Sequence, residues 1–306
     1  MSPRPRLGAL LLVLSCPLAS ACSLRGLAVG GLSSALAGSA AAYAQEDDPE
    51  LVRGALPFVM KTIEGVLIDS PDNEDLLSAA CTTFGLYAYL VQLDGEALQS
   101  SDYAHAERLK RRALALHLRA RDYALRALEL RHAEIGERLR TDPARAVEVL
   151  EEEDVELAYG AAGTWGLAIG LGKDEPALVA DVDAVRALLR RALRLDESWD
   201  QGALHEAMIS VEGLPRAMGG SPERAREHFQ RALALSGGQR ASLYLKLAEN
   251  VSVPAQDRAE FERLLRQALA IDLDSAPDLR LSNRLAKDRA RRLLDGIDEL
   301  FLPPLE

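Results

Sequence analysis

The sequence predicts an all-α protein, a tetratricopeptide-like solenoid of stacked helix pairs. One spacing recurs along the chain: a small or aliphatic residue, a larger one and another small one stand at positions i, i+4 and i+7, shortly before a turn. Aromatic residues make up only 5% of the chain, while Ala, Leu, Arg and Glu, which lose little conformational freedom in a helix, are abundant. Helix pairs of this kind bury their apolar faces by stacking, and the stack leaves a curved inner surface suited to binding.

The recurring spacing is found in five segments. Its clearest copy is Ala225, Phe229 and Ala232, followed by a turn at Gly237. Since each set lies on one face of a helix, we expect these residues to pack between neighbouring helices. The other four copies are Val59, Ile63 and Val66; Ala120, Ala124 and Ala127; Val185, Leu189 and Ala192; and Phe261, Leu265 and Ala268.

The amino end predicts export rather than folded structure. Arg4 and Arg6 form a basic segment, and the apolar run over residues 7–14 that follows is too short to span a membrane. We therefore expect residues 1–21 to be a lipoprotein signal peptide that is removed from the mature protein.

Cys22 is the expected site of lipid attachment. Ala21 stands directly before it, and a signal peptidase for lipoproteins needs a small residue there. We expect residues 22–48 to be a lipidated tether whose acyl chains hold the protein on a membrane, and Ser23 favours the outer membrane. Cys16 is a competing lipidation site, and an ordinary cleavable signal is the alternative interpretation.

Residues 49–306 are expected to form one all-helical domain of tetratricopeptide-like repeats. Asp48 can cap its first helix and Pro49 suits the first helical turn. This helix should end near Asp69, and Pro57 should bend or restart it, because proline lacks a backbone donor.

Further helices follow in order, with two segments of distinct character between them. Residues 151–154 are all acidic and predict a solvated bend. Residues 159–171 are almost uncharged and rich in glycine, which costs roughly 1 kcal/mol per residue in a helix relative to alanine, so close packing or a ligand should compensate. The other helices are expected over about residues 74–92 and 103–134, in a short segment after the Asp142 cap, at regular intervals over 176–273, and over about 279–300.

The net charge argues against one class of partner, and the cysteine content argues against a disulfide. The formal net charge is -11, and the mature chain, having lost Arg4 and Arg6, carries about -13, so phosphate backbones are repelled and nucleic acid is not an expected partner. Cys81 is the single thiol after the tether, so we expect no internal disulfide and a buried, apolar role for this side chain.

Signatures of catalysis and metal binding are incomplete. His205 and Glu206 begin like a zinc-protease helix, but Ile209 stands where the second histidine is required. We expect no catalytic residue, metal or cofactor. An enzyme is the least favoured class, since it would need a cluster of converging polar groups.

Aromatic and polar residues gather on the helices that would line the inner wall, as is typical of a partly wet binding surface. Adjacent residues such as His205 and Glu206 cannot face the same way, so only one should point inward. Core packing of the rings, a structural histidine and helix-end caps at the asparagines are the alternative interpretations. The candidate ligand or partner-binding residues are Tyr87, Tyr89, Trp165, Trp199, His205, Glu206, Tyr244, Glu249, Asn250 and Asn283.

Segments spread over nearly all of the mature chain resemble the T-component lipoproteins, called TatT, that are associated with tripartite ATP-independent periplasmic (TRAP) transporters. The longest match includes Ala248-Glu249-Asn250-Val251-Ser252 and Phe261. Carried over position by position, Trp165, His205, Glu206 and Glu249 are the family-like residues to test first. The matching segments are residues 48–58, 64 with 70–73, 119–123, 165–169, 195–198, 202–206, 225–229 and 235–265.

The resemblance implies a lipid-anchored, all-helical periplasmic protein that self-associates, with a trimer expected, and that is not an enzyme. It also implies a partner, the periplasmic substrate-binding protein of a TRAP transporter. We therefore expect a transport accessory that receives this protein, and a small ligand, on its concave or pore surface. The alternative is a general envelope scaffold that binds peptide segments of other proteins.

Overall fold

The computed structural model describes residues 41–303. The predicted signal peptide and the two lipidation candidates, Cys16 and Cys22, lie outside the described residues. Over residues 41–303 all regular structure is helical and no strand occurs, which confirms the all-α class.

The longer helices carry most of the fold. They are α2 (Pro49–Asp69), α3 (Glu74–Leu98), α4 (Tyr103–Arg131), α7 (Val155–Leu171), α9 (Val182–Leu195), α10 (Trp199–Glu212), α11 (Pro222–Leu235), α13 (Arg258–Ala270) and α14 (Arg280–Asp295). The short helices are α5 (Ile135–Thr141), α6 (Pro143–Ala146), α8 (Pro176–Val179) and α12 (Ala241–Leu247), the last of which continues into the π-helical turn η4 (Ala248–Ser252).

Side-chain caps start several helices, and the cap at Asp48 is one that the sequence predicts. Asp48 accepts hydrogen bonds from the backbone amides of Glu50 at 2.9 Å and Leu51 at 3.2 Å, which satisfies free donors at the start of α2. Asn73, Asp102, Ser221 and Asp257 cap α3, α4, α11 and α13 in the same way. Cap chemistry acts between near neighbours, so these boundaries can be read from the sequence.

α2 passes through Pro57 without interruption, so the expected restart there is wrong. Val52 and Leu56 before the proline, and Met60 and Ile63 after it, are all buried on one face of α2. Their packing keeps the helix continuous across the hydrogen bond that proline removes.

The repeated spacing marks buried faces, as predicted. Ala225, Phe229 and Ala232 are each 5% exposed or less. The sets on α4, α9 and α13 are buried to a similar extent, and only Val59 and Val66 on α2 are half-buried. The tetratricopeptide-like pairing of these helices stays a prediction, since the helices range from 4 residues in α6 to 29 in α4.

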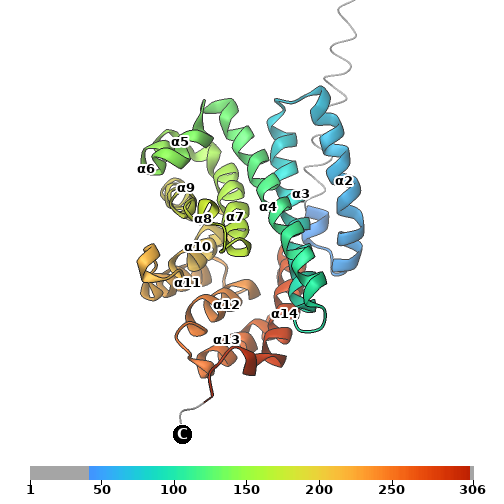
Figure 1. Ribbon diagram of the computed structural model, residues 1–306, viewed down its shortest axis with the longest axis vertical. Coiled ribbons are helices and arrows are strands. Elements are labelled where there is room, and N and C mark those ends of the chain that lie inside the picture. Colours follow the sequence, from blue (N-terminus) through green and yellow to red (C-terminus); the bar gives the residue numbers. More distant parts are fainter. Residues whose placement is uncertain (1–40, 304–306) are drawn as a thin grey trace, which may run out of the picture.

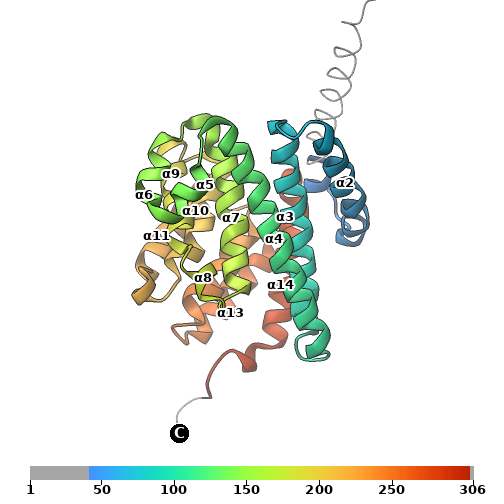
Figure 2. The same ribbon diagram turned by 45° about the horizontal axis from the view of Figure 1, so that its top comes forward.

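The helices form a ring because α14 packs back against the start of the described chain. α2, α3, α4 and α7 lie side by side, and α9 to α13 continue from them (Figures 1 and 2). α14 then returns to the first helices. There Arg284 Nε donates to Asp47 at 2.9 Å, and Gln45 donates to Asp278 at 2.8 Å. Polar contacts between residues more than 230 positions apart thus close the ring.

Close packing accounts for one of the glycines in α7. A Cβ atom on Gly160 would lie 3.0 Å from the Cys81 sulfur on α3, whereas Gly163 and Gly170 face open space. Cys81 is buried, as predicted, and burial raises the pKa of its thiol to about 12. α3 is long and apolar enough to cross a membrane, but 67% of its most apolar window is buried inside the protein, as in a core helix.

The acidic segment over residues 151–154 is exposed at Glu151, Glu152 and Glu153, as its composition predicts, but not at Asp154. It forms a 3-10 turn, η2 (Glu152–Asp154), in which Asp154 is only 1% exposed. Asp154 accepts hydrogen bonds from Arg131 at 3.0 Å and from the Glu151 amide at 2.9 Å, and it lies 2.7 Å from His132 Nε2. Burial alone would raise the pKa of this carboxyl, but these contacts outweigh it and lower the pKa.

Candidate functional site

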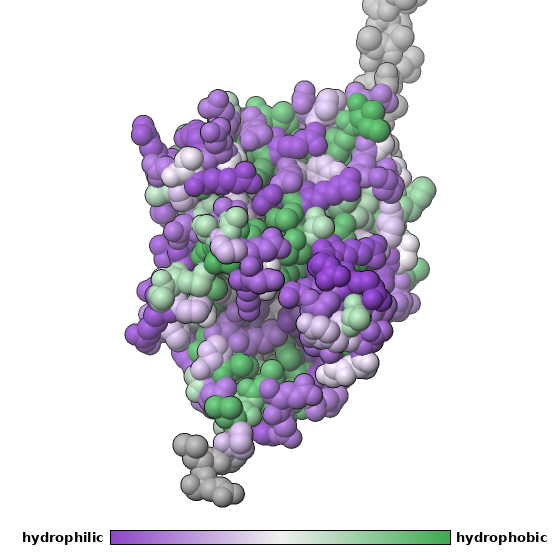
Figure 3. Space-filling view, viewed as in Figure 1, coloured by the Kyte–Doolittle hydropathy of each residue, from purple (hydrophilic) through white to green (hydrophobic). Residues whose placement is uncertain are grey.

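A cavity of about 1060 Å³ lies between helices that are far apart in the sequence. α3, α7, α10, α12 and α14 line it, together with Tyr43 and Ala44 ahead of α2. Figure 3 shows a recess in one face of the molecule, above α12. The volume is at the upper end of the range of about 300–1,000 Å³ that is usual for small-molecule sites, so the cavity has room for a ligand.

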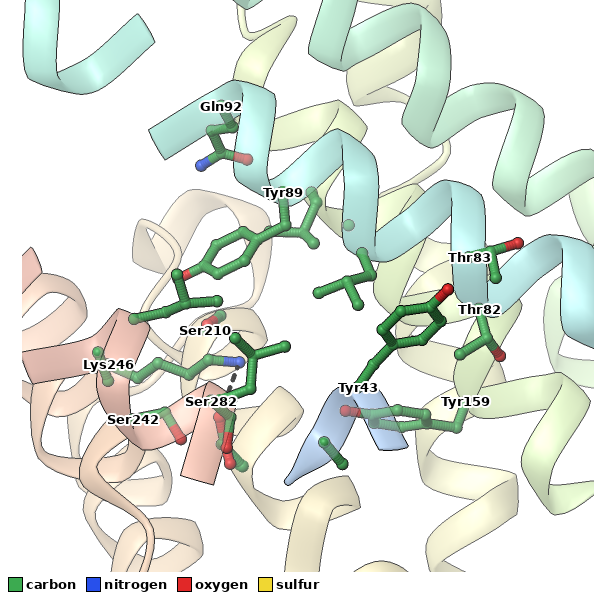
Figure 4. A pocket seen from close by; sticks show the side chains of 18 of the residues that line it. Tyr43, Thr82, Thr83, Tyr89, Gln92, Tyr159, Ser210, Ser242, Lys246 and Ser282 are labelled. Atoms are coloured by element: carbon green, nitrogen blue, oxygen red, sulfur yellow. Dashed lines mark ion pairs between the residues drawn. The ribbon is translucent and has the colours of Figure 1, made fainter. Parts of the chain in front are cut away.

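Three tyrosines give the cavity an aromatic lining. Tyr43, Tyr89 and Tyr159 come from three separate segments, and their rings point into the cavity (Figure 4). Tyr159 is held by Trp199, with ring centroids 4.7 Å apart. Burial raises the pKa of Tyr89 and Tyr159, so both phenols stay protonated and can donate hydrogen bonds. Apolar surface comes from Leu56, Leu86, Leu157, Leu167, Leu171, Leu245, Leu281 and Leu285.

One charged cluster of the cavity is centred on Glu206 of α10. Its Oε2 atom lies 3.6 Å from Arg240 Nη1, and its Oε1 atom lies 3.4 Å from Lys246 Nζ. The ammonium group of Lys246 reaches into the cavity from α12 (Figure 4). Arg240 also donates to Asp200 at 2.8 Å. Glu206 and Arg240 are 8% and 7% exposed, so the charges of this cluster are largely removed from solvent.

A second charged cluster joins the first and last helices. Arg289 of α14 donates to Glu96 of α3 at 3.1 Å and lies 2.9 Å from Glu249 of η4. Burial is the largest influence on Glu249 and raises the pKa of its carboxyl, although Arg289 acts in the opposite direction. Because Lys246 and Glu249 are one helical turn apart, the two clusters form a continuous row of alternating charge along one wall.

Several buried polar atoms of the cavity wall lack a hydrogen-bond partner among residues 41–303. Buried polar groups without partners are rare and costly, and each one needs an explanation. A polar ligand in the cavity would supply the missing partners. The atoms are Gln92 Oε1, Glu206 Oε2 and Arg240 Nε.

Four of the ten candidates from the sequence line this cavity: Tyr89, Glu206, Glu249 and Asn250. They come from α3, α10 and η4, and the closure of the ring brings them together. The Asn250 amide donates to the Lys246 carbonyl at 2.8 Å within its own helix. Lining a cavity is a position and not a function, so their roles in binding remain predictions.

The remaining aromatic candidates pack elsewhere. Trp165 is fully buried in the core, where its indole donates to Asp181 at 3.1 Å. Tyr244 packs edge to face on Phe229. Tyr87 accepts a hydrogen bond from Arg112 at 3.0 Å, and Trp199 contacts the cavity only through Tyr159. These are the packing roles that the alternative interpretation describes.

Asn283 is buried and joins α14 to the start of α12. Its side-chain oxygen accepts from the Ala241 amide, and its amide group donates to the Gln239 carbonyl, both at 2.9 Å. This side chain thus caps a helix of another segment, which agrees with the helix-end alternative.

His205 faces away from the cavity while Glu206 faces into it, as the adjacency of the two residues predicts. His205 Nδ1 lies 2.7 Å from His228 Nδ1, and its Nε2 lies 3.1 Å from Glu197. His228 is half-buried in this arrangement. Burial and the neighbouring His205 lower the pKa of His228 to about 4.

Several residues that line the cavity are not among the candidates predicted from the sequence. They are Tyr43, Tyr159, Arg240, Lys246 and Arg289. For Arg289 a signal exists: it stands four and eight residues after Leu285 and Leu281, so a charge continues an apolar stripe on one face of α14. No comparable pattern marks Arg240, which lies between helices.

The cavity suits noncovalent binding. It offers hydroxyl groups, paired charges and apolar surface, which can hold and orient a small molecule. Within the described part of the chain, no group of three or more His, Cys, Asp or Glu side chains is placed to hold a metal ion.

Comparison with known proteins adds two findings. Residues 45–301 match the model of a family described as the TRAP transporter T-component, TAtT. The chain is also 29% identical, over 308 aligned residues, to a protein of Treponema pallidum (strain Nichols) described as uncharacterized; the alignment covers 94% of this chain and 95% of the relative.

Proposed function

Because the chain belongs to the TRAP transporter T-component family, an accessory of these transporters, we propose that it binds the substrate-binding protein of a TRAP transporter and holds a small ligand in its cavity. In this proposal the protein acts without catalysis. It is anchored by lipid at Cys22, lies in the periplasm at the outer membrane and assembles into a homo-oligomer, with a trimer expected.

The cavity is the observation that carries the ligand part of this proposal. It lies between helices that are far apart in the sequence, has an aromatic and apolar lining, and contains buried polar atoms that lack a hydrogen-bond partner within residues 41–303. A wall of this composition binds amphipathic molecules by burying their apolar part and pairing their polar part.

The partner part rests on family membership and is tested by affinity capture. Full-length lipoprotein in detergent micelles is immobilised and exposed to an envelope extract of its own organism, and bound proteins are identified by mass spectrometry. Specific recovery of an extracytoplasmic solute-binding protein, absent from beads that carry an unrelated lipoprotein, supports the proposal. Recovery of assorted envelope-assembly proteins in its place supports the alternative, a general scaffold that binds peptide segments.

Self-association is tested separately by native mass spectrometry of the lipoprotein released from its micelle. Three copies per particle are expected. A particle that stays monomeric over the micromolar range contradicts the proposed self-association. It does not affect the result of the affinity capture.

A further inference from the structure

Glu206 offers a free hydrogen-bond acceptor and Lys246 offers free hydrogen-bond donors to the same part of the cavity. Glu206 Oε2 is buried and has no hydrogen-bond partner within residues 41–303, so it can accept a bond from a donor. The Lys246 ammonium has three hydrogens, yet the one ion pair that it makes within the described chain is with Glu206, at 3.4 Å. This lysine can therefore donate to an anion.

Two hydroxyl groups complete a polar site around this pair. Ser210 stands one turn after Glu206 on α10, and Ser242 stands one turn before Lys246 on α12, and both line the cavity (Figure 4). We refer to Glu206, Lys246, Ser210 and Ser242 as the head-group site. Apolar side chains of the same cavity, among them Tyr89 and Leu245, lie beyond it.

The charge balance of the head-group site limits what can bind. In the first charged cluster, to which Glu206 and Lys246 belong, the two acidic groups Asp200 and Glu206 are matched by Arg240 and Lys246, so that cluster is neutral as it stands. The whole cavity is lined by eight acidic and four basic side chains. A lone carboxylate would therefore add to a negative excess, and a lone amine would add a third cation beside Arg240 and Lys246 without bringing an anion to balance it.

Resting on the proposed ligand-binding role, we propose that the cavity binds an α-amino acid zwitterion with an apolar side chain. The ligand ammonium donates to Glu206, the ligand carboxylate accepts from Lys246 and the serine hydroxyls, and the side chain lies against Tyr89 and the leucines. A zwitterion satisfies both the free acceptor and the free donor, and it leaves the net charge of the site unchanged.

Three probes with the same aromatic ring and matched linkers separate this class of ligand from its alternatives. L-phenylalanine carries both charges, hydrocinnamate carries only the carboxylate and phenethylamine carries only the ammonium. Isothermal titration of full-length lipoprotein in micelles should show L-phenylalanine binding at least about tenfold more tightly than either analogue, since each analogue leaves one charged partner unmet.

Two variants assign the charges to their partners. Glu206→Gln should weaken the binding of L-phenylalanine and phenethylamine by about tenfold while leaving hydrocinnamate unweakened. Lys246→Met should weaken the binding of L-phenylalanine and hydrocinnamate by about tenfold while leaving phenethylamine unweakened. Lys246 is the less buried of the two, so Lys246→Met tests the site even where the buried Glu206 substitution impairs folding. Glu153→Gln and Lys173→Met are the matched controls, because both residues line the cavity but are exposed, and they should leave all three affinities unchanged.

The outcomes distinguish this inference from the proposed function. Hydrocinnamate that binds as tightly as L-phenylalanine, or discrimination that survives Glu206→Gln and Lys246→Met, overturns the zwitterion. Binding of the apolar dye Nile red without binding of any of the three probes also overturns it, yet leaves a ligand cavity in place. Failure of the dye and all three probes together overturns the ligand role as well, while capture of the substrate-binding protein is judged by its own experiment.

Discussion

The guanidinium group of Arg289 donates to the carboxylate of Glu96 at 3.1 Å, although 193 positions separate the two residues in the sequence. This contact joins α14 to α3 across the cavity, and Glu249 adds a second carboxylate 2.9 Å from the same guanidinium. The second charged cluster of the cavity therefore depends on one side chain, which also adds to the contacts that close the ring.

Replacing that side chain should loosen the ring. Arg289→Met leaves Glu96 and Glu249 partly buried without their cation, so we expect the free energy of unfolding to fall by about 2 kcal/mol or more. Urea denaturation followed by circular dichroism measures the change. Arg291→Met is the matched control, because Arg291 is half exposed and pairs only with Asp288 three residues away, and it should change stability by less than about 0.5 kcal/mol. Equal effects of the two substitutions would contradict the closing role of Arg289.

Gly202 should resist substitution because of its backbone conformation. Its φ is +89°, and a Cβ atom there would lie 3.1 Å from Leu235 Cβ and 3.2 Å from Ala232 Cα. Gly202→Ala should therefore cost about 1–3 kcal/mol of stability, measured by thermal unfolding. Gly54→Ala is the control: Gly54 lies inside α2 with no atom near its missing Cβ, so that substitution should add about 0.5–1 kcal/mol. Loss of stability at Gly54 and none at Gly202 would refute the argument.

The helices and their faces could largely be predicted because the signals for them are local. Ser221 and the positive-φ pair Gly237 and Gly238 mark the two ends of α11, and the spacing of Ala225, Phe229 and Ala232 marks its buried face. Caps, turns and periodicity act within a few residues, so a single segment contains the information.

The cavity could not be predicted in the same way. A helical pattern shows which face is apolar but not which helix it meets, and the approach of Arg289 to Glu96 depends on the combined packing of every helix between them. α7 illustrates the difficulty, since it is nearly uncharged on all sides. Trp165 turns into the core and Tyr159 into the cavity, and no polar face in the sequence distinguishes the two directions.

Acid should destabilise the protein through its buried histidines. Burial lowers the pKa of His117 to about 4 from an ordinary value of 6.5, and both ring nitrogens lack partners within residues 41–303. The folded state therefore keeps this ring neutral, while the unfolded chain takes up a proton near pH 6.5. The free energy of unfolding is therefore unaffected by His117 above pH 6.5. It decreases as the pH falls from 6.5 toward 4, by up to about 3 kcal/mol for this one group. His228 shifts in the same direction and adds to the loss.

His117→Leu isolates the contribution of that one histidine. The substitution removes two unpartnered polar atoms from the interior and the proton uptake of the unfolded chain. We expect about 1 kcal/mol of added stability at pH 7 and a shallower decline between pH 6.5 and pH 4, measured by urea denaturation at each pH. His105→Leu, at a more exposed position of the same helix, should leave the decline unchanged. An unaltered slope in His117→Leu would show that the acid sensitivity has another origin.

Gly170 gives a way to fill the cavity without disturbing the core. It lines the cavity near the end of α7, and no atom lies within 4 Å of where its Cβ would be. Gly170→Phe should therefore leave stability unchanged or slightly raised, since a helical glycine is replaced. Its ring should occupy the space that a ligand needs, so the fluorescence enhancement of Nile red should fall by most of its amplitude. Gly54→Phe makes the same change on the outer face of α2, where Gly54 is exposed, and should keep the dye response. A full dye response in Gly170→Phe would mean that apolar molecules bind elsewhere, and the ligand role of the cavity would then have to be abandoned.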